Sequence, residues 1–343
     1  MKEIKLNKDI IEAIKKGSRI ATVELEVENG NLIVQAFSKN TFFQQKFICE
    51  NSEDMKIQLD KSLLNIILNC GADTTLIEEK EYIKLKSGKV NGKFKKINEK
   101  LPEFQVEEPI FKCSINDMSF IEQVKYATSK VDVRPIIQGV NLHFEEKEIT
   151  AVALDGYRIA RRNSRYKVIE GECCDITVHA NDLEKISLLN GEIIVCVCKK
   201  TVIFVSNNIL LGMKLLEGSY IKYDSLIPKY ENKVKLKGAE FKKAITRMLL
   251  LENSKIELDI NNGYVQINSN AKNNKETKIS EKIISEKNGA DCKMLINAKY
   301  LKDIMDATMI EDDIIIQYND SKTAINITDL SLTTLNLVLP ISG

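Results

Sequence analysis

Three stretches that resemble one another decide the fold of this chain: NKDIIEAIKK at Asn7–Lys16, NDMSFIEQVKYAT at Asn116–Thr128 and GAEFKKAITRML at Gly238–Leu249. Each stretch reads as a helix near the start of one third of the chain. A second similar helix is expected later in each third, at Leu59–Asn69, His179–Leu189 and Ile296–Thr308. Equivalent helices stand about 110–120 residues apart, which is the size of one small domain. We therefore expect three copies of one domain.

Between these helices the chain reads as short strands in which apolar and polar residues alternate. Three hairpins are expected, pairing Thr22–Val27 with Asn31–Ala36, Gly139–Phe144 with Ile149–Ala153, and Lys255–Ile260 with Tyr264–Ser269. Sequences ending in Asn-Gly, a common hairpin turn, join the first and the last pair. Each third is then helix, hairpin, further strands, helix and strands, an antiparallel α+β unit. We place the domains at residues 1–108, 109–228 and 229–343.

The composition excludes several classes of protein. With 343 residues, 43% hydrophobic and 29% charged, the chain is too long for one ordinary core. The net charge of +1 means that any nucleic-acid surface has to be a local patch. No run of about 18 apolar residues indicates a membrane span, and the first residues lack the apolar region of a signal peptide. We expect a cytoplasmic protein whose eight cysteines are reduced.

Residues that commonly carry out catalysis are few. His143 and His179 have no acidic partner at a diagnostic spacing, so we expect structural roles for both. Metal ligation is conceivable for four cysteines: Cys173, Cys174, Cys196 and Cys198. However, the last two alternate with valines in a strand, on one face where small apolar residues belong. Nucleotide-binding and nucleophile motifs are absent from the sequence, and we expect no catalytic residue, no metal and no cofactor.

Basic residues recur on all the expected helices and near their ends. They are Lys15, Lys16, Lys61, Lys125, Lys130, Lys185, Lys242, Lys243, Arg247, Lys299 and Lys302. For any one helix, a solvated face is the simpler interpretation. Six helices in equivalent positions, pointed to a common side, would attract phosphates without reading base sequence.

One segment goes beyond pattern. Val131–Ala160, VDVRPIIQGVNLHFEEKEITAVALDGYRIA, resembles the second domain of the bacterial sliding clamp, the β subunit of DNA polymerase III. The helix INAKYLKDIMDA, the connector EGSYIKYDSLIPK and the ending Leu337–Ile341 are similar to the same family. The resemblance implies three clamp domains, each with antiparallel sheets outside and two helices inside. It also implies a head-to-tail homodimer that closes as a ring around double-stranded DNA, independently of its sequence.

The family's task would make this chain a non-catalytic processivity factor that tethers a polymerase to DNA. Its implied partners are the DNA polymerase III catalytic subunit, the clamp loader and other proteins with a clamp-binding motif, and no membrane. The implied peptide cleft lies between the second and third domains. Its residues would be Ile137, Leu154, Gly156, Tyr157, Arg158, Ile159, Ile221, Ser225, Leu226, Ala324, Leu337, Leu339, Pro340 and Ile341.

The resemblance also assigns DNA and dimer contacts. Lys61 matches a family DNA contact, and Arg19 is placed as a substitute for a family arginine. Val131, Pro135 and Ile136 align with a DNA-contacting loop, where the neighbouring Lys130 and Arg134 would supply the charge. Lys243 and Arg247 share one helix face and join this set. The dimer seam would use Leu250 and Leu251 on the third domain and Phe94 on the first.

Two alternatives stay open. One is a clamp-like interaction protein, or a divergent second clamp, that binds partners without efficient loading on DNA. It is suggested by the ending Leu-Pro-Ile-Ser-Gly, where the family usually has Met-Pro-Met-Arg-Leu. The other alternative is an enzyme that uses the cysteines or a metal.

Overall fold

The computed structural model describes residues 2–49, 53–105, 107–131, 134–274, 276–308 and 312–341. The chain forms two compact units. The first unit contains Met1–Asp117, Tyr166–Cys174 and Asn181–Leu215, and the second contains Met118–Arg165, Asp175–Ala180 and Leu216–Gly343. Among the helices described, none is long and apolar enough to cross a membrane.

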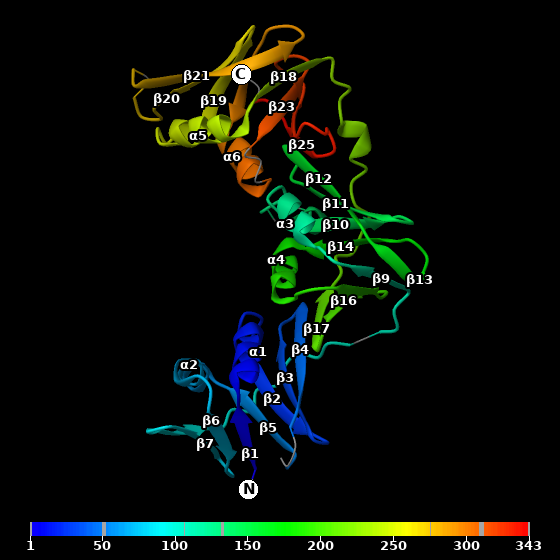
Figure 1. The fold of residues 1–343 in the computed structure, drawn as a ribbon, viewed down its shortest axis with the longest axis vertical. Coiled ribbons are helices and arrows are strands. Elements are labelled where there is room, and N and C mark those ends of the chain that lie inside the picture. Colours follow the sequence, from blue (N-terminus) through cyan, green and yellow to red (C-terminus); the bar gives the residue numbers. More distant parts are fainter. Residues whose placement is uncertain are drawn as a thin grey trace. The chain divides into compact units, whose positions relative to one another are not determined.

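Three repeats share one order of elements: a strand, a helix, four strands, a second helix and three strands (Figure 1). The first repeat consists of β1 (Glu3–Leu6), α1 (Lys8–Ser18), β2 (Val23–Glu28), β3 (Asn31–Phe37), β4 (Thr41–Ile48), β5 (Met55–Leu59), α2 (Lys61–Cys70), β6 (Thr74–Glu78), β7 (Tyr82–Ser87) and β8 (Val90–Lys95).

The second repeat varies this order by splitting the third strand after its first helix into two. It consists of β9 (Phe111–Ile115), α3 (Ser119–Lys125), β10 (Gly139–Phe144), β11 (Glu148–Leu154), β12 (Arg158–Arg165), β13 (Lys167–Gly171), β14 (Asp175–His179), α4 (Ala180–Leu183), β15 (Ile193–Val197), β16 (Thr201–Ser206) and β17 (Ile209–Lys214). Short 3-10 turns are η1 (Pro135–Gln138), η2 (Glu184–Leu188) and, before the third repeat, η3 (Asp224–Leu226).

The third repeat returns to the order of the first. It consists of β18 (Asn232–Lys237), α5 (Gly238–Leu249), β19 (Lys255–Asn261), β20 (Tyr264–Asn270), β21 (Lys278–Asn288), β22 (Cys292–Asn297), α6 (Ala298–Ala307), β23 (Asp313–Tyr318), β24 (Ile325–Thr328) and β25 (Leu335–Val338). Helices α5 and α6 lie side by side and bury Phe241, Ile245, Leu301 and Ile304 in the core of this repeat (Figure 1).

The strands of the described residues form three antiparallel sheets. In the first unit, one sheet has the order β1-β6-β7-β8, and a nine-stranded sheet has the order β13-β9-β15-β16-β17-β4-β3-β2-β5. The second unit holds the order β14-β10-β11-β12-β25-β24-β23-β18-β21-β20-β19-β22. In both large sheets, the last strand of one repeat pairs with the third strand after the first helix of the preceding repeat. These junctions are β17 with β4 and β25 with β12.

Local chemistry explains where several elements begin. The Asn7 side chain accepts a hydrogen bond from the Ile10 amide at 2.9 Å, and Asp60 accepts one from the Leu63 amide at 2.7 Å. Both residues are N-caps, which satisfy amides that the first turn of a helix leaves unpaired. Asn29 and Gly30 have φ of 50° and 75°, the left-handed pair that a two-residue hairpin turn requires.

The three expected hairpins and four of the six expected helices are confirmed to within a few residues. The other two helices are shorter than predicted. The stretch expected as a helix at 116–128 is helical only over α3, and Thr128 donates its hydroxyl to the Lys125 carbonyl at 2.9 Å. The stretch at 179–189 is the four-residue α4 followed by η2, where the Ser187 hydroxyl bonds the Glu184 carbonyl. Such side-chain bonds to the backbone compete with helix continuation.

Candidate functional site

An apolar cluster lies where β12 pairs with β25. Its buried members are Val152, Leu154, Ile159, Leu335 and Leu337, and its partly buried members are Ile137, Tyr220, Ile221, Tyr223, Ile227 and Tyr230. We call this set the β12–β25 cluster. Five residues of the expected cleft therefore come together here although they are far apart in the sequence, which leaves the cleft assignment itself a prediction.

Exposed apolar side chains accompany the buried cluster. Tyr157 is 63% exposed, Leu226 54% and Leu339 43%. The Leu339 amide donates to the Tyr157 carbonyl at 2.9 Å, so the end of β25 is tied to the turn before β12. That turn is shaped by Gly156, with φ of 89°, and by Asp155, which accepts from the amides of Tyr157 and Arg158. Buried and exposed apolar groups next to each other suit a short peptide with hydrophobic anchors.

Arg158 is an anchor of this turn and has little freedom to reach a ligand. Its side chain is 6% exposed and bonds Asp155 at 2.9 Å and Asp303 of α6 at 2.6 Å. The guanidinium also lies over the ring of Tyr300, 4.4 Å from its centroid. Burial lowers the pKa of Arg158, but the two carboxylates outweigh it and the pKa lies above its usual value.

The remaining expected cleft residues are placed as follows. Ser225 lies in η3 and donates its hydroxyl to the Lys222 carbonyl at 3.3 Å. Ala324 is buried just before β24 but does not belong to the β12–β25 cluster. Pro340 and Ile341 follow β25, and the Ile341 amide donates to the Leu295 carbonyl at 2.7 Å.

Sequence reasoning missed six members of this cluster. They are Val152, Leu335, Tyr220, Tyr223, Ile227 and Tyr230. A signal was available for two of them, because Val152 and Leu335 precede Leu154 and Leu337 by two positions and so share their strand face. The tyrosines stand in or next to the connector that was singled out for its isoleucine, serine and leucine.

The expected DNA-contacting side chains differ in their surroundings. Lys61 and Lys243 lie at the surface, and no carboxylate of the described residues forms an ion pair with either. Arg247 instead bonds Glu281, and the Arg19 guanidinium reaches the Ser187 hydroxyl at 3.5 Å. Other helix lysines are paired with acids: Lys125 with Glu122, Lys185 with Asp182, Lys242 with Asp306 and Lys302 with Asp306.

Lys130 and Arg134 border residues 132–133, which lie outside the described part of the chain. The neighbouring residues that align with the family's DNA-contacting loop, Pro135 and Ile136, begin η1. The structure thus leaves two cations at the surface of this loop, and their role stays a prediction.

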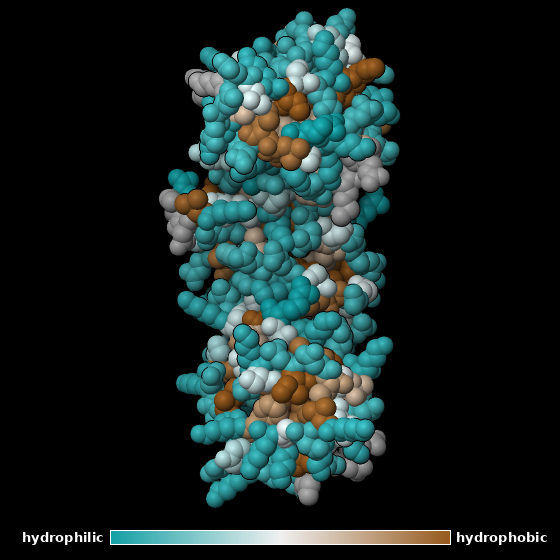
Figure 2. Space-filling model, turned by 90° about the vertical axis from the view of Figure 1, so that its left-hand side faces the viewer, coloured by the Kyte–Doolittle hydropathy of each residue, from teal (hydrophilic) through white to brown (hydrophobic). Residues whose placement is uncertain are grey.

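The residues expected at the dimer seam lie at two apolar surface positions. Leu250 follows α5 and is 76% exposed, while Leu251 is partly buried. Phe94 is on the edge strand β8, and its ring covers Gly92. Figure 2 shows an apolar patch bordered by hydrophilic side chains on each unit. In the first unit the patch lies level with α2 of Figure 1, and in the second unit it lies level with α5.

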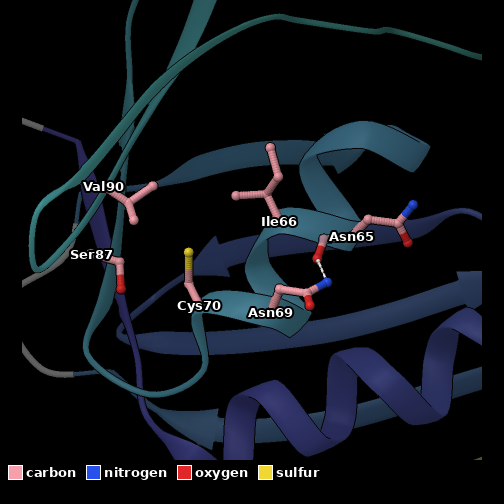
Figure 3. Close-up of a pocket in the computed structure, with 6 residues that line it drawn as sticks. All are labelled: Asn65, Ile66, Asn69, Cys70, Ser87 and Val90. Carbon is pink, nitrogen blue, oxygen red and sulfur yellow. Dashed lines mark hydrogen bonds between the residues drawn. The ribbon is translucent and has the colours of Figure 1, made fainter.

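A surface pocket of about 550 Å³ lies beside β8. It is lined by Asn65, Ile66, Asn69, Cys70, Ser87 and Val90. Figure 3 shows Ile66 of α2 and Val90 of β8 facing one opening, with the Cys70 thiol between them. The Asn69 amide donates to the Asn65 carbonyl at 2.7 Å, which leaves the apolar groups to shape the mouth.

The histidine interpretation needs one correction. His143 does have acidic partners: its Nδ1 lies 2.8 Å from Asp175 and its Nε2 lies 3.3 Å from Glu145. Asp175 is 32 positions away in sequence, and it meets His143 because β14 pairs with β10 in that register. The spacing in the chain therefore carried no signal of the Asp175 contact, whereas Glu145 lies only two positions away.

The cysteines show no metal-binding arrangement among the residues that the structure describes. Cys196 is partly buried on β15, whereas Cys198 is buried beyond its end and donates its thiol to the Glu107 carbonyl. Burial raises the pKa of both thiols, which keeps them protonated and poorly nucleophilic.

Two family profiles match consecutive parts of the chain. The central domain of the DNA polymerase III beta subunit matches residues 116–222, and its C-terminal domain matches residues 224–341. The chain belongs to the DNA polymerase III β subunit family. This membership confirms the resemblance that was found in the sequence.

Individual relatives agree with the family. The chain is 28% identical to the beta sliding clamp of Bacillus subtilis over 198 residues, which cover 54% of this chain and 52% of that protein. It is 24% identical to the beta sliding clamp of Streptococcus pneumoniae over 317 residues, covering 84% and 82%. The match thus spans about half the length of the first of these curated relatives.

Solved structures confirm the fold. The β subunit of DNA polymerase III from Thermotoga maritima superposes with a TM-score of 0.91 at 16% identity, over 99% of both chains. A putative β subunit from Eubacterium rectale gives 0.89 at 18% identity, over 99% and 100%. The three-domain clamp fold of the family is therefore the fold of this chain.

Proposed function

We propose that this chain is a DNA sliding clamp. It would close as a head-to-tail homodimer around double-stranded DNA and hold a DNA polymerase there as a non-catalytic accessory subunit. Family membership supports this function, and so does the way that the repeats of this chain join one another. The observation that carries the proposal concerns two strand edges that remain unpaired once both internal junctions have formed. One edge belongs to the first repeat and the other to the third.

The two internal junctions use one register. Met213 of β17 lies opposite Thr41 of β4, and Val338 of β25 lies opposite Arg158 of β12. In the first repeat, the equivalent last strand is β8, which is the edge of its sheet. In the third repeat, the strand equivalent to β4 and β12 is the first half of β21, which pairs with β20 on one side. A second copy brings these two edges together and closes a ring by rotation.

The repeats also predict the register of this closure. Stepping across the strand pairings, with each register continued by one residue where needed, leads from Lys2 to Phe94 in the first repeat and from Asn232 to Val338 in the third, and both starting residues stand six positions before a first helix. Counting residues from the β11–β12 turn and from the β20–β21 turn shows that Thr277 occupies the position in the third repeat that Arg158 occupies in the second. Phe94 of one copy should then lie opposite Thr277 of the other.

The helices support the same closure. Within the second unit α3 contacts α6, and within the first unit Arg19, which caps α1, reaches Ser187 in η2. Each contact joins the first helix of one repeat to the second helical segment of the next. The equivalent contact between copies would join α5 to α2, so that the exposed Leu250 could enter the pocket beside Ile66.

Topological retention is the direct test of this function. The protein is incubated with linear plasmid so that a ring can thread over the ends, the plasmid is ligated into a circle, the complex is isolated by gel filtration, and half is cut once by a restriction enzyme. We expect retention on the circle and rapid loss from the linear product, because a closed ring leaves only over a free end. Equally fast release from both forms would rule the clamp function out.

The DNA-facing side is tested by charge reversal. Lys61→Glu with Lys243→Glu should lower recovery on the circle, because both lysines lie at the surface and have no paired carboxylate among the described residues. A matched control, Lys147→Glu with Lys199→Glu, changes exposed turn lysines elsewhere. Equal losses in both variants would mean that net charge, and not the helix surface, governs retention.

The β12–β25 cluster and its exposed neighbours would bind a short partner peptide. Leu339→Asp with Pro340→Ala should abolish binding of a fluorescein-labelled hexapeptide with leucine and phenylalanine anchors, measured by anisotropy. Leu330→Asp is the control, because Leu330 is also an exposed leucine. Unchanged affinity in the double variant would place the peptide site elsewhere.

A second candidate function is a clamp-like protein that binds partners without staying on DNA. The pairing of Arg247, Lys125, Lys185, Lys242 and Lys302 with carboxylates favours it, because these pairs reduce the positive charge available to phosphates. Peptide binding together with no retention on circular plasmid would support this alternative.

A further inference from the structure

The sheet β1-β6-β7-β8 carries an unusual concentration of positive charge. Residues 80–100 contain eight lysines and two glutamates, whereas the whole chain has 50 basic and 49 acidic residues. This segment contributes β7, β8 and the turn between them. The charge is therefore local to one sheet of an otherwise balanced protein.

Strand register places these lysines on one face. The inner face buries Ile4, Leu76, Ile83 and Leu85. Residues of the opposite face alternate with them, and the pairings set Lys84 opposite Lys93, Lys86 opposite Asn91, and Tyr82 opposite Lys95. Lys5 of β1 and Lys86 of β7 lie in one row across the strands, with Thr75 of β6 between them. Neighbouring strands are about 4.8 Å apart, so the ammonium groups form a compact array.

Few carboxylates balance this face. Lys84 pairs with Glu79, while Glu78 is taken by Lys2 and Lys96. Glu3 is the acidic residue that these four described strands place on the same face. For Lys5, Lys86 and Lys95, no ion pair forms with any residue of the described ranges.

Like charges on adjacent strands are unfavourable, so this face gains from a polyanion that neutralises them. All its cations are lysines, which act as flexible point charges and lack the planar fork with which arginine binds carboxylate or phosphate in one fixed geometry. Lys93 lies over the Tyr82 ring, 4.0 Å from its centroid, so the ring is covered and not open to a stacked base. A close row of point charges suits the dense, regular charge of a phosphate backbone, which is contacted without reading bases.

We propose that the outer face of this sheet binds the phosphate backbone of nucleic acid independently of its sequence. This contact is separate from the helix contacts of the proposed clamp and needs no ring, because it uses one sheet of a single copy. Single strands and duplexes offer the same chemistry, and the experiment distinguishes them.

The test uses a labelled 20-nucleotide strand and the matching duplex, with anisotropy measured at several salt concentrations. Lys5→Gln with Lys86→Gln removes two cations, on β1 and β7, that form no ion pair within the described residues, and it spares the edge strand β8. At low salt we expect affinity to fall about threefold or more, and the salt dependence to become shallower by about 0.7 per lost contact on the single strand. Lys147→Gln with Lys199→Gln is the control of equal charge and should bind as the wild type does.

Four results would overturn the proposal. The sheet variant could bind like the wild type, both variants could weaken equally, or only Lys61→Glu with Lys243→Glu could lose the oligonucleotide. Binding of polyglutamate with no binding of either nucleic acid would assign the face to an acidic protein instead. Failure of the clamp function would appear separately, as equal release from circular and linear plasmid, because a short linear oligonucleotide cannot be retained by a ring.

Discussion

Arg158 and Arg162 lie on the same strand, β12, and both are buried, yet their partners differ. Arg158 bonds two carboxylates, whereas Arg162 bonds the neutral oxygens of Gln123, Leu335 and Asn336. Burial lowers the pKa of Arg162, while the carboxylates raise that of Arg158. Each guanidinium joins the second repeat to the third, so both hold the β12–β25 junction in register.

Arg158→Ala should destabilise the second unit by about 3 kcal/mol, because it leaves the largely buried Asp155 without its cation. The loss is measured as the change in free energy of unfolding in urea. Arg161→Ala is the control, since its pair with Asp224 is 3.9 Å long and exposed and should be worth less than about 1 kcal/mol. Equal losses in the two variants would contradict the anchoring role of Arg158.

The His143 contacts predict a pH dependence. Partial burial lowers the pKa of His143, but the hydrogen bond to Asp175 and the charges of Asp175 and Glu145 outweigh it, so the pKa lies above 6.5. A raised pKa in the folded state gives stability that is present below pH 6.5 and is lost as the pH rises through the folded value. The gain should be under about 1 kcal/mol because the pair is exposed.

This dependence is checked with His143→Gln. The wild type should exceed the variant in melting temperature at mildly acidic pH, and the difference should vanish at alkaline pH. Titration of the imidazole followed by NMR should show a midpoint above 6.5. A midpoint at or below that value would show that the two carboxylates do not dominate.

At the scale of elements, the helices depend on their first residues. Helix α2 begins after Asp60, which caps the Leu63 amide, and it carries Lys61 and the pocket residue Ile66. Disturbing this cap therefore affects a proposed DNA contact and a proposed dimer contact together.

Asp60→Ala should lower the free energy of unfolding of the first unit by about 1 kcal/mol, because an amide of the first turn loses its acceptor. Ser62→Ala in the same turn is the matched control and should change it little, since Ser62 is exposed. Hydrogen exchange of the Leu63 amide reports the cap directly. Unchanged exchange in Asp60→Ala would mean that the carboxylate does not hold the helix start.

At the scale of the whole molecule, the repeats explain the assembly that we propose. Two junctions within the chain join a last strand to the third strand after a first helix, and both have the same register. A third junction of this kind is possible only between copies, between β8 and β21. The closed dimer would then pair every repeat with the next.

Phe94→Cys with Thr277→Cys tests this closure. Directly opposed residues of antiparallel strands have Cα atoms about 4.5–5.5 Å apart, which suits a disulfide. We expect a cross-linked dimer under mild oxidation. Mass spectrometry of peptides identifies the link between the two substituted positions, since native cysteines are also present. Lys89→Cys with Thr277→Cys is the control and should link poorly, and a link formed preferentially by the control would show a shifted register.

Local chemistry made much of this protein predictable. The Asn-Gly turns and alternating strands depend on neighbours in sequence, so the hairpins followed from the chain alone. Helix α5 was predicted to the residue, and the family followed from one contiguous segment, Val131–Ala160. Helix length was less predictable, as in α3, because hydroxyl bonds to the backbone compete with the helical pattern.

The sequence by itself therefore determined the repeat, the order of its elements and the family, because these rest on short-range pattern. Only the tertiary structure decided which strands meet: β17 with β4, and β25 with β12. Tertiary structure also brought Asp175 of β14 to His143 of β10, and Asp303 of α6 to Arg158 of β12. These contacts join residues that are far apart along the chain, and the number of residues between two positions does not indicate how close they lie in the folded protein.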